Sequence, residues 1–160
     1  MEISIRRAND RDAVRVTELL HQVLDIHAKI RPDIFLAGTT KYSRDELSEI
    51  FRDDLRPVFV AVDENDRTVG YAFCIMKEQS GINLVHCKTL YIDDLCVDSS
   101  CRGSHIGRKL YDYVIDYARK SGCSNVTLNV WEGNNSARAF YEKQGMKVRS
   151  TQMETIIEKN

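Results

Sequence analysis

The strongest constraint in this sequence is the order of its apolar patterns between residues 86 and 144. A β-rich run over 86–97 is followed by a helical stripe over 105–120, a second β-rich run over 126–130 and another helical segment over 134–144. Two strands joined through a helix pair in parallel, because the crossover returns the chain to the same end of the sheet. The order therefore predicts an α/β domain.

The first half of the chain adds antiparallel elements to this unit. The expected elements are a strand at 3–5, helices over 10–31 and 43–54, and a hairpin of strands 58–62 and 69–77. Residues 147–158 are interpreted as one or two final strands. We therefore expect one domain over residues 1–160, with a mixed, mostly antiparallel-edged central sheet of about seven strands flanked by about four helices.

Charge and cysteine usage exclude several classes of protein. Lys plus Arg number 23 and Asp plus Glu 24, so the net charge is -1 and there is no basic excess of the kind typical of nucleic-acid binders. The five cysteines form no C-x-x-C pair, which argues against a disulfide framework or a zinc ribbon, and we expect no metal. The amino terminus is too polar for a signal peptide, and no apolar run approaches the ~18 residues of a membrane span. We expect a cytoplasmic protein that binds neither nucleic acid nor membrane.

The segment with most chemical information runs from Leu95 to Leu110. An apolar strand ends, a loop with two glycines and three cations follows, and an amphipathic helix begins. The free N–H groups at a helix start favour a phosphate, although two glycines at a helix start can also be purely structural. The segment has neither the P-loop pattern G-x-x-x-x-G-K-[ST] nor the dinucleotide pattern G-x-G-x-x-G.

A third phosphate-binding pattern does fit this loop. The run Arg102-Gly103-Ser104-His105-Ile106-Gly107 resembles the acetyl-CoA signature R/Q-x-x-G-x-G/A of the GNAT family (GCN5-related N-acetyltransferases). Residues 134–146 resemble that family's second CoA segment, N-x-x-A-x-x-x-Y-x-x-x-G. The departure is His105, which stands where the family often has glycine. The order of elements also resembles the GNAT fold from end to end, including its splayed pair of parallel strands.

The resemblance implies an N-acetyltransferase that moves an acetyl group from acetyl-CoA to a primary amine by direct attack in a ternary complex. It implies Tyr141 as the general acid for the departing thiolate. The residues implied in acetyl-CoA binding are Leu95, Cys96, Val97, Arg102, Gly103, Ser104, His105, Ile106, Gly107, Arg108, Asn134, Ala137 and Tyr141. Leu95 and Val97 are expected to act through main-chain groups in the gap between the splayed strands. Asn134 also has the simpler interpretation of a helix cap.

Asp93 and Asp94 stand inside an otherwise apolar strand, where a carboxylate is costly unless it is paired or hydrated. Strand alternation predicts that the two side chains lie on opposite faces. Asp93 aligns with the strand carboxylate that some GNAT enzymes use as a base, either directly or through water. The sequence favours Asp93 over Asp94, as a base or as an anchor for a cationic acceptor.

The acceptor is left open by the sequence. The run from His27 to Phe35 is interpreted as a lid on the acceptor side. A small amine, a lysine side chain and a peptide N-terminus all remain compatible with it. The alternative function is a non-catalytic acyl-CoA-binding sensor or partner module. A homodimer is compatible with the family, but no interface can be identified from the sequence.

Overall fold

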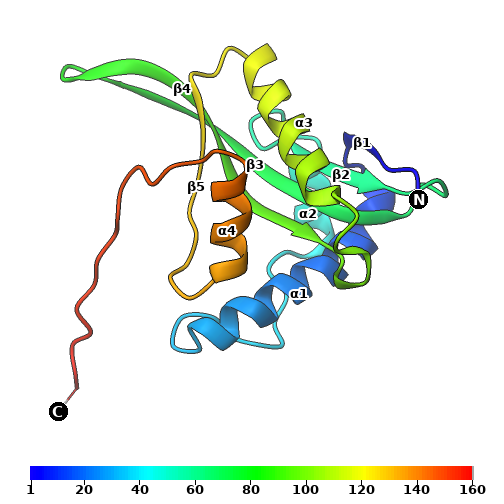
Figure 1. Ribbon diagram of the computed structural model, residues 1–160, viewed down its shortest axis with the longest axis horizontal. Helices are drawn as coiled ribbons and strands as arrows, with labels where there is room; N and C mark the ends of the chain where they lie inside the picture. The colour runs from blue at the N-terminus through cyan, green and yellow to red at the C-terminus, as the bar shows by residue number, and fades with distance from the viewer. Residues whose placement is uncertain (160) are drawn as a thin grey trace.

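The computed structural model describes residues 1–159, which form one mixed sheet with helices on both faces (Figure 1). Its strands are β1 (Ser4–Arg7), β2 (Val58–Val62), β3 (Thr68–Gly81), β4 (Leu84–Val97) and β5 (Asn125–Leu128). Its helices are α1 (Ala13–Ile30), α2 (Arg44–Phe51), α3 (Ile106–Lys120) and α4 (Asn135–Lys143), with short 3-10 helices η1 (Asp10–Asp12) and η2 (Ser99–Cys101).

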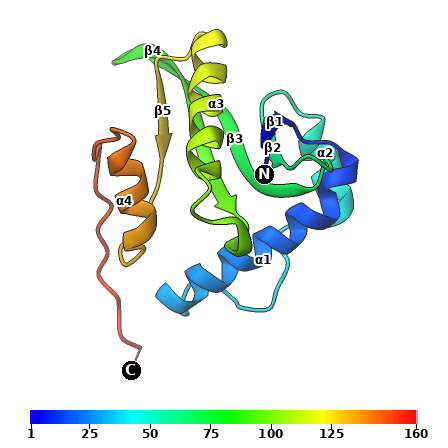
Figure 2. The same ribbon diagram turned by 45° about the vertical axis from the view of Figure 1, so that its right-hand side comes forward.

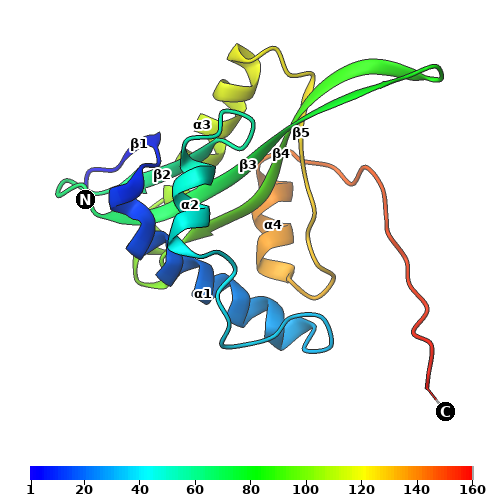
Figure 3. The same ribbon diagram turned by 180° about the vertical axis from the view of Figure 1, so that it is seen from behind.

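The sheet has the order β1-β2-β3-β4-β5, antiparallel except for the parallel pair β4–β5. The α/β class and the parallel pair are confirmed. The expectation of about seven strands is wrong for the described residues, in which the sheet has five. The predicted hairpin of 58–62 and 69–77 is present as β2 and β3, but β3 and β4 are both longer than predicted, because they pair through an exposed end over 78–88 that extends beyond the body of the domain (Figure 3).

Two apolar layers hold the domain together. On one face α1 and α2 pack on β2 and β3, with Leu19, Leu47 and Tyr71 fully buried. On the other face α3 packs on the sheet through Leu110 and Val114, and α4 lies beside β5 (Figure 2). Alternating side chains of the central strands enter the two layers, so a sheet buried on both faces carries nearly continuous apolar runs.

The helix starts follow their capping signals. The Asn9 side chain accepts a hydrogen bond from the amide of Arg11, and Asp12 bonds back to the amide of Asn9. Ser43 and Glu46 form a capping box at α2, which begins where a helix over 43–54 was predicted. α1 ends at Ile30, before the proline that follows Arg31, because the residue preceding a proline disfavours the helical conformation.

A β-bulge at Asp93 divides β4 into two parts. Phe73 pairs with Asp94 and Cys74 pairs with Ile92, so Asp93 is the extra residue. Before the bulge, Ile92 packs in the α3 layer; after it, Leu95 packs in that layer instead. After the bulge, the alternation of side chains between the two layers is therefore displaced by one residue.

The carboxy-terminal tail also differs from the expectation, which was one or two final strands over 147–158. Residues 147–159 form neither helix nor strand and are exposed along their whole length. Figures 1 and 3 show this segment leaving the body beyond α4. An alternating pattern gives a segment the propensity of a strand, but a strand also requires a neighbouring backbone to pair with. Among residues 1–159, no neighbouring backbone pairs with this segment.

Candidate active site at the bulge of β4

The central feature of the site is a gap between the two parallel strands. β5 pairs with residues 89–92 of β4 and ends at Leu128, whereas β4 continues to Val97. The amide of Asp98 donates to Val69 on β3 at 2.8 Å. Since main-chain groups alternate in direction along an antiparallel strand, those of Leu95 and Val97 point away from β3, toward the side where β5 has ended. Polar main-chain groups of β4 therefore point into the gap, where an extended ligand can meet them.

Asp98 fixes the loop that follows β4. Its carboxylate caps η2 by accepting from the amide of Ser100 at 3.1 Å, and it forms an ion pair with Arg15 of α1. The amide of Ser99 donates to the side chain of Gln22 at 3.1 Å. Burial alone would raise the pKa of Asp98, but these hydrogen bonds and Arg15 lower it to about 2. The ion pair with Arg15 therefore holds the loop against α1, through a carboxylate that is ionised at neutral pH.

The start of α3 presents free N–H groups to solvent. His105 is the residue before the helix; it has φ 58° and no side-chain capping bond. Gly103 has φ 87°, and the segment from Arg102 to His105 is exposed. A left-handed residue at position 105 explains why glycine is favoured at this step of the pattern. The loop and Arg108 offer an exposed, cationic helix start suited to phosphates.

Three residues from the predicted acetyl-CoA set have a packing role. Cys96 and Ile106 are buried in the apolar layers, so their side chains face away from the loop surface. A Cβ on Gly107 would lie 3.4 Å from the ring of Phe140, so glycine here brings α3 close to α4. A ligand can meet these positions through the main chain.

Asp94 lies in the layer between the sheet and α1. The hydroxyl of Tyr71 donates to Oδ2 of Asp94 at 2.6 Å. Burial raises the pKa of Asp94 to about 6, while the Tyr71 hydrogen bond and the charge of Lys41 act in the opposite direction. A carboxylate with this pKa is ionised at neutral pH and accepts a proton more readily than an ordinary one.

Asp93 carries a cation in this structure. The ammonium of Lys41, from the loop between α1 and α2, lies 3.1 Å from Oδ2 of Asp93. Burial would lower the pKa of Lys41, but the charges of Asp93 and Asp94 raise it. The charge of Lys41 therefore interacts with both carboxylates. The expectation that the side chains of Asp93 and Asp94 lie on opposite faces of the strand is wrong. The bulge at Asp93 interrupts the alternation on which that expectation rested.

Tyr141 lies on α4 and packs against the α3 layer. Its ring centroid is 5.1 Å from that of Phe140 and 6.4 Å from that of Tyr111. Burial, followed by the negative charge of Asp94, raises the pKa of Tyr141 well above its ordinary value. The phenol therefore keeps its proton at neutral pH, and the charge of Asp94 reaches it.

Asn134 and Ala137 form the cap of α4. The side chain of Asn134 accepts a hydrogen bond from the amide of Ala137 at 3.3 Å. The simpler interpretation of Asn134 as a helix cap is thus what the structure shows. The side-chain amide nitrogen of Asn134 is left for another acceptor.

Aromatic side chains form a cluster at the carboxy-terminal end of α1. The ring of Phe35 lies 5.3 Å from Trp131 and 5.0 Å from His27, and the guanidinium of Arg31 lies over Trp131. Burial, followed by the charge of Lys41, lowers the pKa of His27, which favours the neutral ring. The run from His27 to Phe35 therefore contacts the segment after β5.

Three residues of this region were missed at the sequence level. Tyr71 lies in an apolar strand pattern, and no local signal shows that it faces Asp94. Lys41 stands between the two predicted helices 10–31 and 43–54, with no motif around it. Trp131, the only tryptophan of the chain, lies three residues before the start of the second CoA-like segment, and this position is the one sequence signal among the three.

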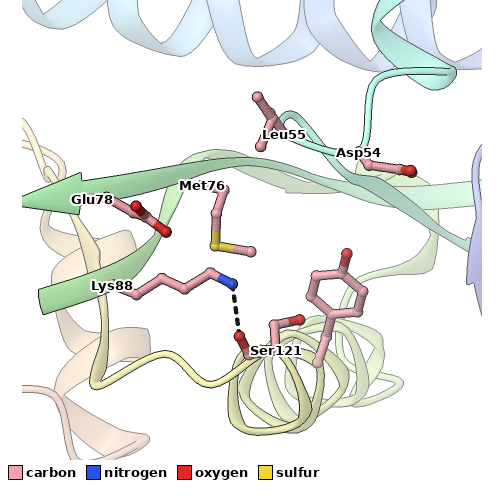
Figure 4. A pocket seen from close by; sticks show the side chains of 7 residues that line it. Asp54, Leu55, Met76, Glu78, Lys88 and Ser121 are labelled. Atoms are coloured by element: carbon pink, nitrogen blue, oxygen red, sulfur yellow. Dashed lines mark hydrogen bonds between the residues drawn. The ribbon is translucent and has the colours of Figure 1, made fainter.

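A separate pocket of about 560 Å³ lies at the base of the β3–β4 hairpin, beside the end of α3 (Figure 4). Asp54, Glu78 and Lys88 line it, and the ammonium of Lys88 donates to the carbonyl of Ser121 at 2.8 Å. It shares no residue with the carboxylates of the bulge or with the loop before α3.

Within residues 1–159, no group of three His, Cys, Asp or Glu residues is placed to hold a metal ion, and no helix is long and apolar enough to span a membrane.

Comparison with known proteins identifies one family. A sequence model of the acetyltransferase (GNAT) family matches residues 20–146. The chain is 28% identical over 148 residues to the peptidyl-lysine N-acetyltransferase YjaB of Escherichia coli, covering 92% of this chain and 84% of that one. It is 38% identical over 66 residues to glucosamine 6-phosphate N-acetyltransferase of Arabidopsis thaliana, a match that spans 41% of this chain and only 42% of that enzyme.

Solved structures show the same fold. A mutant of the BH1408 protein from Bacillus halodurans superposes with a TM-score of 0.92 at 30% identity, covering 97% of this chain and 99% of that one. An aminoglycoside acetyltransferase from an uncultured soil metagenomic sample superposes with a TM-score of 0.74 at 18% identity, covering 98% and 97% of the two chains, a likeness of fold alone. The superposition with the BH1408 protein covers the sheet, the gap and the loop before α3.

Proposed function

The chain belongs to the acetyltransferase (GNAT) family, and from this premise we propose that it acetylates a lysine-like alkylamine at the carboxylates of the β4 bulge. Family membership makes it an N-acetyltransferase and implies acetyl-CoA as the acetyl donor. The acceptor class and the roles of individual residues are our proposals.

The groups present fit acetyl-CoA. Main-chain groups of Leu95 and Val97 point to the side of the gap, where they match the amides of the pantetheine arm. The exposed start of α3, with Arg102 and Arg108 nearby, matches the phosphates. We assign the remaining amide nitrogen of the Asn134 side chain to a hydrogen bond with the arm, because its oxygen already caps α4. When bound, acetyl-CoA supplies the thioester whose acetyl group is transferred.

The observation that carries the acceptor proposal is the contact between Lys41 and Asp93. A lysine ammonium of the chain itself lies 3.1 Å from Asp93 and within the field of Asp94. The site thus accommodates an alkylammonium on a flexible stem. That chemistry agrees with the activity of YjaB, a peptidyl-lysine N-acetyltransferase. Lys41 occupies this position in the free protein, and the acceptor displaces it.

The proposed chemistry requires a base for the ammonium and an acid for the departing sulfur. Asp93 holds the incoming ammonium, and Asp94, with a pKa of about 6, takes one proton from it and leaves a neutral amine. The amine nitrogen then bonds to the acetyl carbon as the bond from that carbon to sulfur breaks, and the nitrogen loses its second proton to solvent. A main-chain N–H near Leu95 polarises the carbonyl, and Tyr141 gives its proton to the departing sulfur. The proton that Asp94 took up then passes to Tyr141 through solvent, which restores both groups.

The test measures release of free thiol from acetyl-CoA with a panel of amines. A lysine peptide, a polyamine and glucosamine 6-phosphate are the three arms, and the mass of each product identifies the acetylated nitrogen. We expect turnover with the lysine peptide and a lower KM for that peptide in Lys41→Met, because Asp93 is then free. Turnover only with glucosamine 6-phosphate would exclude the alkylamine proposal. Binding of acetyl-CoA without thiol release in any arm would favour the non-catalytic module.

A further inference from the structure

Lys41, in the loop between α1 and α2, brings an alkylamine of the chain itself to the carboxylates of the β4 bulge. Its Nζ atom lies 3.1 Å from Oδ2 of Asp93, and its charge also acts on Asp94. The proposed base, the proposed anchor and a primary amine are therefore together in one chain. Lys41 meets the same chemical requirements as the acceptor whose place it occupies.

Both neighbours of Lys41 are anchored to the body of the domain. The hydroxyl of Thr40 lies 3.1 Å from Nε2 of His21 on α1. The ring of Tyr42 stacks on that of Phe73 on β3, with the centroids 5.9 Å apart. The ammonium of Lys41 itself lies 5.3 Å from the centroid of the Tyr42 ring, a favourable place for a cation. The loop therefore directs this lysine to one place instead of leaving it free to move through solvent.

The ion pair makes Lys41 a poor nucleophile unless a base acts on it. Burial would lower the pKa of Lys41, but the contact with Asp93 and the charge of Asp94 raise it. An ammonium has no lone pair, so a raised pKa slows the uncatalysed reaction of a lysine with a thioester. Preferential acetylation of Lys41 would therefore report catalysis by the site and not the intrinsic reactivity of the side chain.

We propose, on the basis of the proposed function, that this enzyme acetylates its own Lys41 within one chain when acetyl-CoA is bound and no acceptor is present. Asp94 takes one proton from Nζ of Lys41, and the nitrogen bonds to the acetyl carbon as the bond from that carbon to sulfur breaks. Tyr141 gives its proton to the sulfur, and the nitrogen loses its second proton to solvent. The products are acetylated Lys41 and the free thiol of CoA.

Acetylation of Lys41 changes the state of the acceptor site. The amide that forms carries no charge, so the ion pair with Asp93 is lost. Asp93 is then available to the ammonium of an incoming acceptor. Self-acetylation thus converts a protein whose acceptor site holds its own lysine into one with a higher affinity for the acceptor, and acetyl-CoA activates the enzyme as well as supplying the acetyl group.

The first experiment incubates the wild type with acetyl-CoA alone and follows each lysine by peptide mass spectrometry over time. Lys120 is the matched control, because it pairs with Asp116 at 2.8 Å and that contact also raises its pKa, but it lies at the exposed end of α3. We expect Lys41 to be acetylated at least about 10²-fold faster than Lys120, the lower limit for general-base catalysis. Equal rates at the two lysines overturn the proposal.

Two variants and a dilution series show how the acetyl group reaches Lys41. Asp94→Asn should lower the rate at Lys41 to that at Lys120, and Tyr141→Phe should also lower it by about 10²-fold. Circular dichroism checks that each variant is folded. The rate constant should not depend on the protein concentration, because the transfer occurs within one chain. A rate constant that rises in proportion to concentration would show transfer between copies and contradict the proposal.

A lysine peptide assayed in parallel separates this inference from the proposed function. Acetylation of the peptide without acetylation of Lys41 leaves the proposed function in place and overturns self-acetylation. Acetylation of Lys41 without acetylation of the peptide supports self-acetylation and excludes the lysine-like acceptor. If neither is acetylated, both proposals are wrong.

The second experiment measures the effect on the acceptor. Wild-type protein is treated with acetyl-CoA until Lys41 is fully acetylated, freed of CoA, and compared with untreated protein in initial rates with acetyl-CoA added last. We expect the KM for the lysine peptide to fall by about two- to fivefold, the contribution of a partly exposed ion pair. Lys41→Met treated in the same way should show no change in KM. An unchanged KM after complete acetylation of the wild type would rule out the activating role.

Discussion

The hydroxyl of Tyr71 on β3 donates a 2.6 Å hydrogen bond to the carboxylate of Asp94 on β4, inside the layer between the sheet and α1. This bond stabilises the ionised form of Asp94 and so opposes the burial that raises its pKa to about 6. The balance between the two effects leaves a carboxylate that is ionised but basic at neutral pH, and the first predictions follow from it.

Replacing Tyr71 by phenylalanine is expected to raise the pKa of Asp94 further. The donor is lost while the burial remains, so Asp94 binds its proton more tightly. The acidic limb of kcat/KM against pH should then move to higher pH than in the wild type. Tyr117→Phe, on the opposite face, is the control and should leave the limb in place. An unchanged limb in Tyr71→Phe would mean that Asp94 does not set it.

Asn substitutions should separate the two carboxylates. Asp94→Asn removes the proposed base and is expected to lower kcat by about 10²–10⁴-fold, the range for a lost general base. Asp93→Asn removes the contact with the acceptor ammonium and should chiefly raise KM for the amine. Steady-state kinetics with a lysine peptide distinguishes the two effects. A larger loss of kcat in Asp93→Asn would reverse the proposed roles and return the base to Asp93.

Tyr141→Phe should slow turnover by about 10²-fold or more, because the departing sulfur loses its proton donor. Tyr111→Phe provides the control, since its ring centroid lies 6.4 Å away and its pKa is likewise raised by burial. The measurement is kcat for thiol release at saturating acetyl-CoA. Equal turnover in Tyr141→Phe and the wild type would rule out Tyr141 as the general acid.

His105→Gly is expected to increase the free energy of unfolding by up to about 1 kcal/mol, because His105 is left-handed and a side chain is disfavoured there. The affinity for CoA should not fall, since the loop binds through main-chain groups. Gly103→Ala, at φ 87°, should lower stability. Urea unfolding and calorimetric titration with CoA measure both quantities. A less stable His105→Gly would show that the histidine side chain supports the loop.

The stability of the wild type should fall relative to Asp94→Asn as the pH rises from about 4 to 6. The pKa of Asp94 is higher in the folded than in the unfolded chain, so folding takes up a proton in this range and its ionisation opposes folding above it. The full shift corresponds to at most about 3 kcal/mol. Asp98, with a lowered pKa, acts in the opposite sense, and its contribution is lost as the pH falls through its folded pKa of about 2. Urea unfolding at a series of pH values tests the difference.

The sequence by itself determined the parts of this protein that depend on local chemistry. The helices and their caps at Asn9 and Ser43, the β-α-β-α order, and the two CoA-like segments all depend on residues close together in the chain. Spacing within a segment is enough to predict such features, because the interactions that form them span only a few residues.

The tertiary structure decided which side chains meet. The bulge at Asp93 depends on how β3 and β4 pair, and it placed Asp93 and Asp94 beside the same lysine, against strict alternation. Tyr71 and Lys41 reach these carboxylates from distant parts of the chain. Whether residues 147–158 form a strand depends on a neighbouring backbone, which no pattern within the segment can supply. Register and pairing are properties of two strands together, and a single segment encodes only half of each.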